Sequence, residues 1–452
     1  MTSHGDRASA RPTLSNAAPR GLAGAVAVPG DKSISHRSLM LGALAVGETR
    51  IEGLLEGEDV LATAGAMRAM GADIARDKAG VWHVHGAGVG GLMQPAQALD
   101  MGNSGTSTRL LMGLLASHGL TATFIGDASL SKRPMGRVIE PLSLMGADFN
   151  AAPGAKGTQC LPLTMRGLSP AVPISYRLPV ASAQVKSAIL LAGLNTPGIT
   201  HVIEPVPTRD HSERMLQGFG AKLTVEKDSD GASIISLTGE AELRPQHIVV
   251  PGDPSSAAFP MVAALIVPGS DIVIRNVGLN PTRAGLVELL KAMGGSIDIL
   301  DPREVGGEPV GDLHVRHSML SGIEPDPAAA PSMIDEFPIA FIAAACAKGR
   351  SVFRGLDELR VKESDRIATM ATGLRAIGVQ VAEIEDGLVI DGTGGDPLPG
   401  GGPIATLLDH RIAMSFAVAG LHSRNGVTID DMAPVATSFP GFTAMLAELG
   451  AA

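Results

Sequence analysis

Residues 30–51 read GDKSISHRSLMLGALAVGETRI, and residues 66–74 read AMRAMGADI. The first stretch is a polar turn followed by an Ala- and Leu-rich helix, a loop with glycine and a β-branched strand. The second is a helix end that stops at Gly71 before a short apolar strand. Glycine commonly ends helices because it adopts the left-handed conformation without a Cβ penalty. Together the two stretches predict one unit of helix, strand, helix and strand.

The same unit recurs along the whole chain. Five further polar turns open Ala-rich helices, in the stretches 102–124, 181–202, 252–274, 334–353 and 409–429. Each is followed by a second helix that ends in glycine, and the six glycines are Gly71, Gly146, Gly220, Gly294, Gly378 and Gly450. Because self-similarity at a regular period indicates a repeat architecture, we predict an α/β protein of six units, each about 75 residues long.

A duplicated tetrapeptide, VPGD at 28–31 and 250–253, divides the six units into two similar domains of three units each. We expect a first α/β domain at 30–249 and a second one formed by 22–29 and 250–452, so that the chain passes between the two domains twice. Residues 1–21 lack an apolar stretch, which predicts a disordered tail rather than a secretory signal. Helix starts present N–H groups and the positive end of the helix dipole, so such starts facing an interdomain cleft would bind anions.

The composition excludes several classes of partner. The 452 residues carry a formal net charge of −10, which argues against nucleic acid or an anionic membrane as partner. No apolar run approaches the roughly 20 residues that span a bilayer. Cys160 and Cys346 are the only cysteines and lie far apart in the sequence, so neither a disulfide framework nor a zinc site is indicated. A reducing cytoplasm fits this composition best.

Basic and hydrogen-bonding groups are spread unevenly over the six turns. GDKSISHR at 30–37 is rich in them, whereas GDPSSAAFP at 252–260 repeats the opening without a basic group. We therefore interpret Asp253, Ser255 and Ser256 as helix caps only. Local clusters of Lys and Arg in an acidic protein predict a pocket for a ligand with several phosphate or carboxylate groups. Asp335 and Glu363 add carboxylates beside these cations, as expected of groups that transfer protons.

Each motif alone also fits an ordinary structural role. RVKESDR at 360–366 could be a solvated helix face, and His36 is better interpreted as a hydrogen-bonding neighbour than as a catalyst. No P-loop, dinucleotide fingerprint or metal motif is present. The binding site is favoured because basic groups occur at corresponding places in five of the six repeats.

Seven motifs follow one another along the chain: PGDKSISHR (29–37), GNSGTSTR (102–109), KRPMGR (132–137), ASAQVKSA (181–188), IDEFP (334–338), LRVKESDR (359–366) and DHRIAMS (409–415). In these motifs and their order, the chain resembles the 5-enolpyruvylshikimate-3-phosphate (EPSP) synthase family over residues 22–450. The resemblance implies two domains of three α/β units with the active site in the cleft between them. It also implies transfer of the enolpyruvyl group of phosphoenolpyruvate to the 5-hydroxyl of shikimate 3-phosphate, with release of phosphate. We expect a cytoplasmic monomer without metal or cofactor.

The resemblance further implies roles for individual residues. Shikimate 3-phosphate would be bound by Lys32, Ser33, Arg37, Ser182, Ala183, Gln184, Arg209, Asp335 and Lys362. Phosphoenolpyruvate would be bound by Lys32, Gly105, Arg133, Gln184, Arg366 and Arg411. Asp335 would take the 5-hydroxyl proton, while Glu363 and Lys32 would serve the methylene proton.

The motifs ASAQ (181–184) and TRDH (208–211), with Thr437 in ATSFPGF, resemble a bacterial subgroup that includes glyphosate-tolerant enzymes. Tolerant members carry Ala where this chain has Gly105, so we expect this chain to be more glyphosate-sensitive than they are.

Two alternatives stay open. The sister enolpyruvyl transferase acting on UDP-N-acetylglucosamine uses a cysteine that SLSKRPMGR (129–137) lacks. A non-catalytic anion-binding protein would gain nothing from Asp335 and Glu363.

Overall fold

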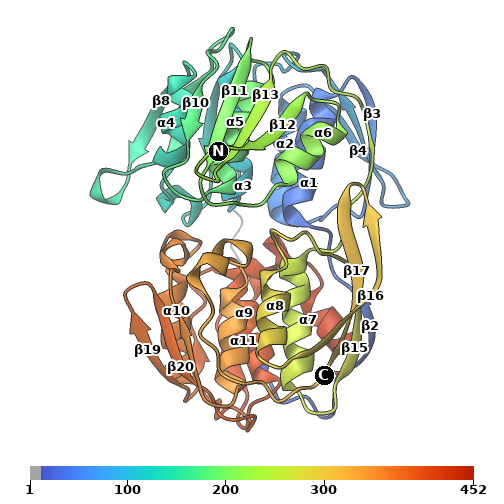
Figure 1. The fold of residues 1–452 in the computed structure, drawn as a ribbon, viewed down its shortest axis with the longest axis vertical. Coiled ribbons are helices and arrows are strands. Elements are labelled where there is room, and N and C mark those ends of the chain that lie inside the picture. Colours follow the sequence, from blue (N-terminus) through green and yellow to red (C-terminus); the bar gives the residue numbers. More distant parts are fainter. Residues whose placement is uncertain (1–11, 452) are drawn as a thin grey trace. The chain divides into compact units, whose positions relative to one another are not determined.

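The computed structural model describes residues 12–451, which form two compact units (Figure 1). The first unit contains 29–251 and 304–309, and the second contains the residues up to 28, 252–303 and those from 310 onward. Residues 304–309 are the tip of a hairpin, and its strands belong to a sheet of the second unit. The sequence contained no sign of this excursion.

The first unit contains three sheets with the same topology. One has the order β14 (His247–Val249), β3 (Gly47–Glu52), β5 (Trp82–Gly86) and β4 (Asp73–Arg76). The next has the order β6 (Leu99–Asp100), β7 (Thr121–Ile125), β9 (Gln159–Arg166) and β8 (Asp148–Pro153). The third has the order β10 (Ser175–Arg177), β11 (Ile199–Glu204), β13 (Ser233–Thr238) and β12 (Leu223–Lys227). In each, the first pair is parallel and the other two pairs are antiparallel.

The second unit also contains three sheets. They have the orders β16 (Ser296–Val305), β17 (Glu308–Arg316), β15 (Asp271–Gly278), β2 (Ala23–Ala27); β18 (Arg350–Phe353), β20 (Gly387–Asp391), β19 (Gln380–Ile384); and β1 (Thr13–Ser15), β22 (Val427–Ile429), β21 (Pro403–Ile404). Strand β2 pairs with β15 in parallel, as β21 does with β22. The six-unit α/β architecture predicted from the repeat is therefore confirmed.

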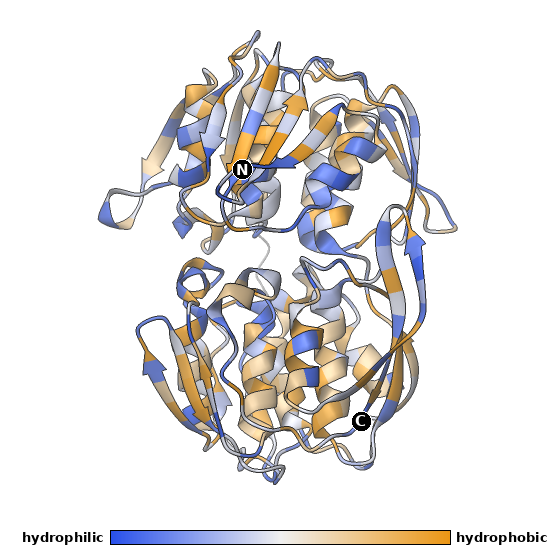
Figure 2. Cartoon of the chain, viewed as in Figure 1, coloured by the Kyte–Doolittle hydropathy of each residue, from blue (hydrophilic) through white to orange (hydrophobic). Residues whose placement is uncertain are grey.

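Each unit of the repeat opens with a helix that is almost entirely buried. These helices are α1 (Lys32–Leu44), α3 (Gly105–Ala116), α5 (Ala183–Gly193), α7 (Pro254–Ile266), α9 (Phe337–Cys346) and α11 (His410–Gly420). Helices α7, α9 and α11 pack on one another inside the second unit, and α3 packs on α5 inside the first. Figure 2 shows α9 in apolar colours, as its Ala- and Ile-rich sequence requires. Each of the two compact units consequently has its own hydrophobic core.

The second helix of each repeat ends where the sequence predicted. These helices are α2 (Glu58–Ala69), α4 (Gly136–Leu144), α6 (His211–Gly218), α8 (Gly285–Ala292), α10 (Arg366–Ala376) and α12 (Phe442–Glu448). The predicted glycine follows each of them, and all six glycines have φ between +81° and +101°. The left-handed helix stops are therefore confirmed. Five short 3₁₀ helices complete the described elements: Leu130–Lys132, Ala155–Gly157, Pro327–Ser332, Asp357–Val361 and Ala433–Thr437.

The predicted disordered tail, 1–21, needs a correction. Residues 1–11 lie outside the described residues, but Thr13–Ser15 form β1 and pair with β22. The hydroxyl of Ser15 also donates to the carbonyl of Ala417, at 2.7 Å. The expectation was wrong for these residues because backbone groups can be satisfied by a distant strand, even where the local sequence has little apolar character. Among residues 12–451, no helix combines the length and hydropathy needed to cross a membrane.

Candidate functional site

The turn before α1 presents a lysine at the start of the helix. The Asp31 carboxylate caps the helix by accepting from the N–H of Ile34, at 2.8 Å. Lys32 then forms an ion pair with Asp59 of α2, and 19% of the Lys32 side chain is exposed against 6% of the Asp59 side chain. The ammonium group thus stands at a helix start with a buried carboxylate as its neighbour. Sequence reasoning missed Asp59 because nothing local connects residues 32 and 59.

Arg37 is buried among hydroxyl groups. Its Nε donates to Ser212, at 2.8 Å, and its NH2 donates to Ser187, at 2.7 Å. Its NH1 donates to the carbonyl of Ser33, at 2.9 Å. Arg37 therefore braces α1 against α5 and α6, a structural role that the sequence did not indicate. Its contact with shikimate 3-phosphate stays a prediction.

His36 is fully buried beside this turn. Its Nδ1 lies 2.8 Å from the hydroxyl of Thr63, so it is a hydrogen-bonding neighbour, as interpreted. Burial lowers the pKa of His36 well below its ordinary value, and the charges of Lys32 and Arg37 lower it further. The ring is consequently neutral in the folded protein at pH 7.

A second group of predicted residues gathers at the start of α3. Arg109 donates to the side-chain oxygen of Gln184, at 3.0 Å, and the Gln184 amide donates to Thr106, at 3.1 Å. A Cβ added at Gly105 would lie 2.9 Å from NH1 of Arg109 and 3.1 Å from NH1 of Arg133. The structure therefore brings Gly105, Gln184 and Arg133 together. Arg109, the last residue of the GNSGTSTR motif, had no predicted role, and its guanidinium group links Gln184 to the position of Gly105.

The start of α5 and the loop before α6 carry further predicted residues. Ser182 caps α5 by accepting from the N–H of Val185, at 3.4 Å, and Ala183 is the first residue of the helix. Arg209 lies in the loop directly after Thr208, whose N–H donates to the buried Glu204, at 3.1 Å. This anchoring of Thr208 fixes the backbone that presents Arg209.

Behind this loop lies a buried ion cluster. The Nζ of Lys186 lies 3.1 Å from Glu204 and 2.7 Å from Glu213. Burial raises the pKa of Glu213, and the nearby Lys186 opposes that rise. Since removing one partner from such a cluster leaves an uncompensated charge, these three side chains hold α5, β11 and α6 in fixed positions.

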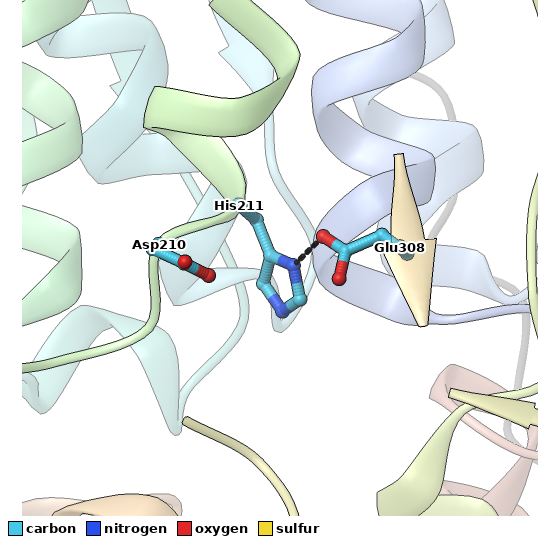
Figure 3. Close-up of side chains that lie close together, drawn as sticks. All are labelled: Asp210, His211 and Glu308. Carbon is cyan, nitrogen blue, oxygen red and sulfur yellow. Dashed lines mark hydrogen bonds and ion pairs between the residues drawn. The ribbon is translucent and has the colours of Figure 1, made fainter. Parts of the chain in front are cut away.

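Three side chains in the first unit could in principle hold a cation. Asp210, His211 and Glu308 present potential ligand atoms within 4.8 Å of one another (Figure 3). However, Nδ1 of His211 lies 2.9 Å from Glu308, and Asp210 accepts from Arg214, at 2.8 Å. Nδ1 of His211 and the Asp210 carboxylate thus have protein partners, whereas the buried Nε2 of His211 has no hydrogen-bond partner among the described residues. Glu308, at the hairpin tip, anchors that tip to the start of α6.

The second unit gathers the predicted acid-base residues around Arg366. Asp335 lies 3.3 Å from NH1 of Arg366 and 3.5 Å from Nζ of Lys362. Glu363 lies 2.5 Å from NH2 of Arg366. The main-chain carbonyl of Asp335 accepts from NH1 of Arg411, at 3.0 Å. All five predicted residues of this unit are therefore in one cluster.

Arg366 is nearly saturated by carboxylates. Its Nε and NH2 also donate to Asp409, at 2.9 and 3.3 Å, and only 1% of its side chain is exposed. Burial lowers the pKa of Arg366, but the charges of Asp409, Glu363 and Asp335 outweigh it, so the net pKa lies above its ordinary value. Arg366 thus organises the carboxylates, and its contact with phosphoenolpyruvate stays a prediction. Asp409, the first residue of the DHRIAMS motif, also caps α11, and no role was predicted for it.

The turn at 252–255 does more than cap a helix. Asp253 caps α7 as expected, accepting from the N–H of Ser255 at 2.8 Å. The Ser255 hydroxyl, however, donates to Glu336 and accepts from Arg283, at 2.6 Å. Interpreting Ser255 as a cap only was therefore wrong. Its two partners lie far away in the sequence, where local patterns cannot show them.

Comparison with known proteins defines the class first. The enolpyruvyl transferase NikO from Streptomyces tendae matches 98% of this chain and 98% of its own, with a TM-score of 0.74 and 20% identity. At that identity the likeness shows the fold alone, which this chain shares with that enolpyruvyl transferase.

The sequence comparisons then define the family. Residues 17–446 match the family model of EPSP synthase (3-phosphoshikimate 1-carboxyvinyltransferase), and the chain belongs to this family. It is 74% identical to 3-phosphoshikimate 1-carboxyvinyltransferase of Sphingopyxis alaskensis, over 95% of this chain and 96% of the relative. It is 70% identical to that of Zymomonas mobilis, over 97% and 96%. The solved EPSP synthase of Acinetobacter baumannii is 49% identical, with a TM-score of 0.83 over 97% of this chain and 98% of that one.

Proposed function

We propose that the chain catalyses the reaction for which its family is named. It transfers the enolpyruvyl group of phosphoenolpyruvate to the 5-hydroxyl of shikimate 3-phosphate and releases phosphate, in the shikimate pathway to chorismate. The observation that carries this proposal is the cluster of Asp335 and Glu363 with Lys362, Arg366 and Arg411. Such a cluster combines groups that move protons with cations that hold anions.

The predicted residues divide the work between the two units, which we propose are the functional domains. In the first unit, shikimate 3-phosphate would be held by Lys32, Ser33, Arg37, Ser182, Ala183, Gln184 and Arg209. Phosphoenolpyruvate would contact Lys32, Gly105, Arg133 and Gln184 of that unit. In the second unit, Asp335 and Lys362 would complete the first ligand set, and Arg366 and Arg411 the second.

The chemistry needs two proton-transfer events. The 5-hydroxyl oxygen attacks the central carbon of phosphoenolpyruvate while the adjacent methylene carbon gains a proton, which yields a tetrahedral intermediate. That intermediate then loses the methyl proton and phosphate, which restores the double bond. Asp335 would take the hydroxyl proton, because Lys362 and Arg366 hold its carboxylate in place. Glu363 and Lys32 would deliver and remove the methylene proton.

A direct assay tests this proposal. Purified protein is mixed with shikimate 3-phosphate and phosphoenolpyruvate, and phosphate release is measured. We expect release with this pair and none when UDP-N-acetylglucosamine replaces shikimate 3-phosphate. Release only with the nucleotide sugar would favour the sister enzyme, and silence with both would favour an anion-binding protein. The Asp335→Asn variant should lower kcat by about 10²- to 10⁴-fold, as loss of a general base does.

We further propose that the enzyme works as a monomer in the cytoplasm and needs no metal. Both cysteines are buried and unpaired, which suits a reducing compartment, and burial raises the pKa of the Cys346 thiol to about 12. Light scattering coupled to size-exclusion chromatography tests the mass of the particle. Dialysis against EDTA should leave turnover unchanged, and a loss that Zn²⁺ or Mg²⁺ restores would contradict this proposal.

A further inference from the structure

Two adjacent carboxylates at the start of α9 have different surroundings. Asp335 lies among cations with 16% of its side chain exposed, whereas only 2% of the Glu336 side chain is exposed. The Oε1 atom of Glu336 accepts from the hydroxyl of Ser255 and lies 3.6 Å from NH2 of Arg283. The predicted base is therefore followed directly by a buried, charged residue to which no role has been assigned.

A buried hydrogen-bond network ties this carboxylate to the start of α7. NH2 of Arg283 donates to Ser255, at 2.6 Å, and to Asp253, at 3.1 Å. Asp253 also caps α7 through the N–H of Ser255. All of these side chains are buried, so the network connects two helix starts without access to water. Oε2 of Glu336 has no hydrogen-bond partner among the described residues, so the carboxylate is held through Oε1, and loss of that contact would leave a buried charge without a hydrogen bond.

Arg411 brings a further cation to the carboxylates of this network. Asp253 and Glu336 carry two negative charges, and Arg283 carries one positive charge. NH1 of Arg411 supplies the second cation, at 4.0 Å from Oε1 of Glu336. The same NH1 donates to the carbonyl of Asp335, at 3.0 Å. Since a buried carboxylate is costly without matching charge, Glu336 favours this one orientation of the guanidinium group.

The other end of Arg411 is left for a ligand. Its Nε and NH2 groups have no hydrogen-bond partner among residues 12–451, whereas Arg366 uses Nε, NH1 and NH2 for carboxylates. A guanidinium group held by NH1 presents its remaining N–H groups in a fixed direction. This is the arrangement needed to bind a carboxylate or phosphate group bidentately.

We infer that Glu336 is a positioning residue for Arg411, and that Ser255 and Arg283 hold Glu336 in place for this purpose. The inference rests on the proposed function, in which Arg411 binds phosphoenolpyruvate. Glu336 contacts neither substrate. Glu336 acts by fixing the direction of Nε and NH2 of Arg411. Its loss should therefore raise the KM for phosphoenolpyruvate more than it lowers kcat.

Two variants and one matched control test this inference. Glu336→Gln keeps the size of the side chain and an acceptor for Ser255 but removes the charge, and we expect the KM for phosphoenolpyruvate to rise about tenfold. Ser255→Ala should raise the KM for phosphoenolpyruvate about threefold, because Glu336 keeps its charge but loses the hydrogen bond from Ser255. In both variants, kcat should change less than about twofold, and so should the KM for shikimate 3-phosphate. Ser270→Ala is the control, since Ser270 is a buried serine of the same unit with two hydrogen bonds. It should leave both KM values unchanged.

A double-mutant cycle separates positioning from general loss of structure. If Glu336 acts through Arg411, Glu336→Gln should add nothing to the rise in KM that Arg411→Gln causes alone. Effects that multiply would overturn the inference, as would a Glu336→Gln variant whose kinetics match those of Ser270→Ala. A wild-type protein that is inactive with both substrates would instead refute the proposed function, so the two failures are distinguishable.

Discussion

The turns before α1 and α7 use the same backbone device for different purposes. Both read Gly-Asp, both aspartates cap their helix, and both helices have 13 residues and end in extended backbone. At the first helical position one has Lys32 and the other has Pro254. Five positions later in each helix, Arg37 is braced by two serines, whereas Phe259 packs edge-on against Phe442, with 5.9 Å between ring centroids.

The difference shows that two repeats can share the same helix cap while one exposes its polar side chains at the helix start and the other buries them. In the first turn, Lys32 is partly exposed at the helix start, where a ligand can reach it. In the fourth turn, Ser255 faces inward and holds Glu336. The fourth turn is therefore not an inactive copy. In the proposed function, the first turn would bind ligands directly, and the fourth would act on ligand binding through Glu336, which Ser255 holds.

The largest expected effect concerns Lys32, which the fourth turn lacks. Lys32→Met removes the ammonium group and leaves Asp59 buried without its cation, so we expect kcat/KM to fall by at least about 10³-fold. Steady-state phosphate release measures this loss. Lys291→Met, in the last turn of α8, is the control and should behave as the wild type. A Lys32 variant with more than a tenth of wild-type activity would contradict a ligand-facing role for the first turn.

The next prediction separates the two units by stability. Arg37→Met removes the guanidinium donor of Ser187 and Ser212, which then keep only the hydrogen bond between their own hydroxyl groups, so the unfolding free energy of the first unit should fall by about 3 kcal/mol. Phe259→Leu should cost the second unit about 1 kcal/mol. Trp82 is the single tryptophan and lies buried in β5 of the first unit, so its fluorescence during urea denaturation reports that unit. Arg37→Met should shift this transition and Phe259→Leu should not, and equal shifts would mean that the units unfold together.

A smaller effect concerns pH, because His36 corresponds to Ala258 in the fourth turn. The pKa of buried His36 is lowered, whereas the unfolded chain keeps a value near 6.5. Below pH 6.5 the unfolded chain therefore binds a proton that the folded ring does not. The stability of the first unit consequently decreases as the pH is lowered. Between pH 7 and 5 the loss from this group should be about 1–2 kcal/mol. Trp82-monitored denaturation of wild type and His36→Gln measures it, and an equal pH dependence of the two would refute the assignment.

The smallest expected effect concerns the turn before α3, where Gly105 leaves space for two guanidinium groups. A methyl group there would lie 2.9 Å from NH1 of Arg109 and 3.1 Å from NH1 of Arg133, so both side-chain ends must shift. We expect Gly105→Ala to raise the KM for phosphoenolpyruvate about fivefold, a change of about 1 kcal/mol. The inhibition constant of glyphosate should rise as well. Values unchanged from wild type would show that the two arginines have room to adapt.

The sequence by itself determined the repeat, because its signals are local. Periodic apolar residues define each helix, glycines such as Gly71 stop it, and aspartates such as Asp31 cap it, all within a few residues of one another. An anion pocket could be predicted for a related reason, because Lys32 and Arg411 occur at helix starts, where the backbone itself favours anions. The roles of the individual residues came from the resemblance to the family.

Only the tertiary structure decided which side chains meet. The pairing of Lys32 with Asp59, the bracing of Arg37 by Ser187 and Ser212, and the contact of Ser255 with Glu336 join residues from 27 to 175 positions apart. Strand β1 likewise depends on its distant partner β22. Such pairs arise because buried polar groups must find partners wherever the packed helices bring them. A one-dimensional pattern shows that a partner is needed, and the packing of the six repeats determines which residue it is.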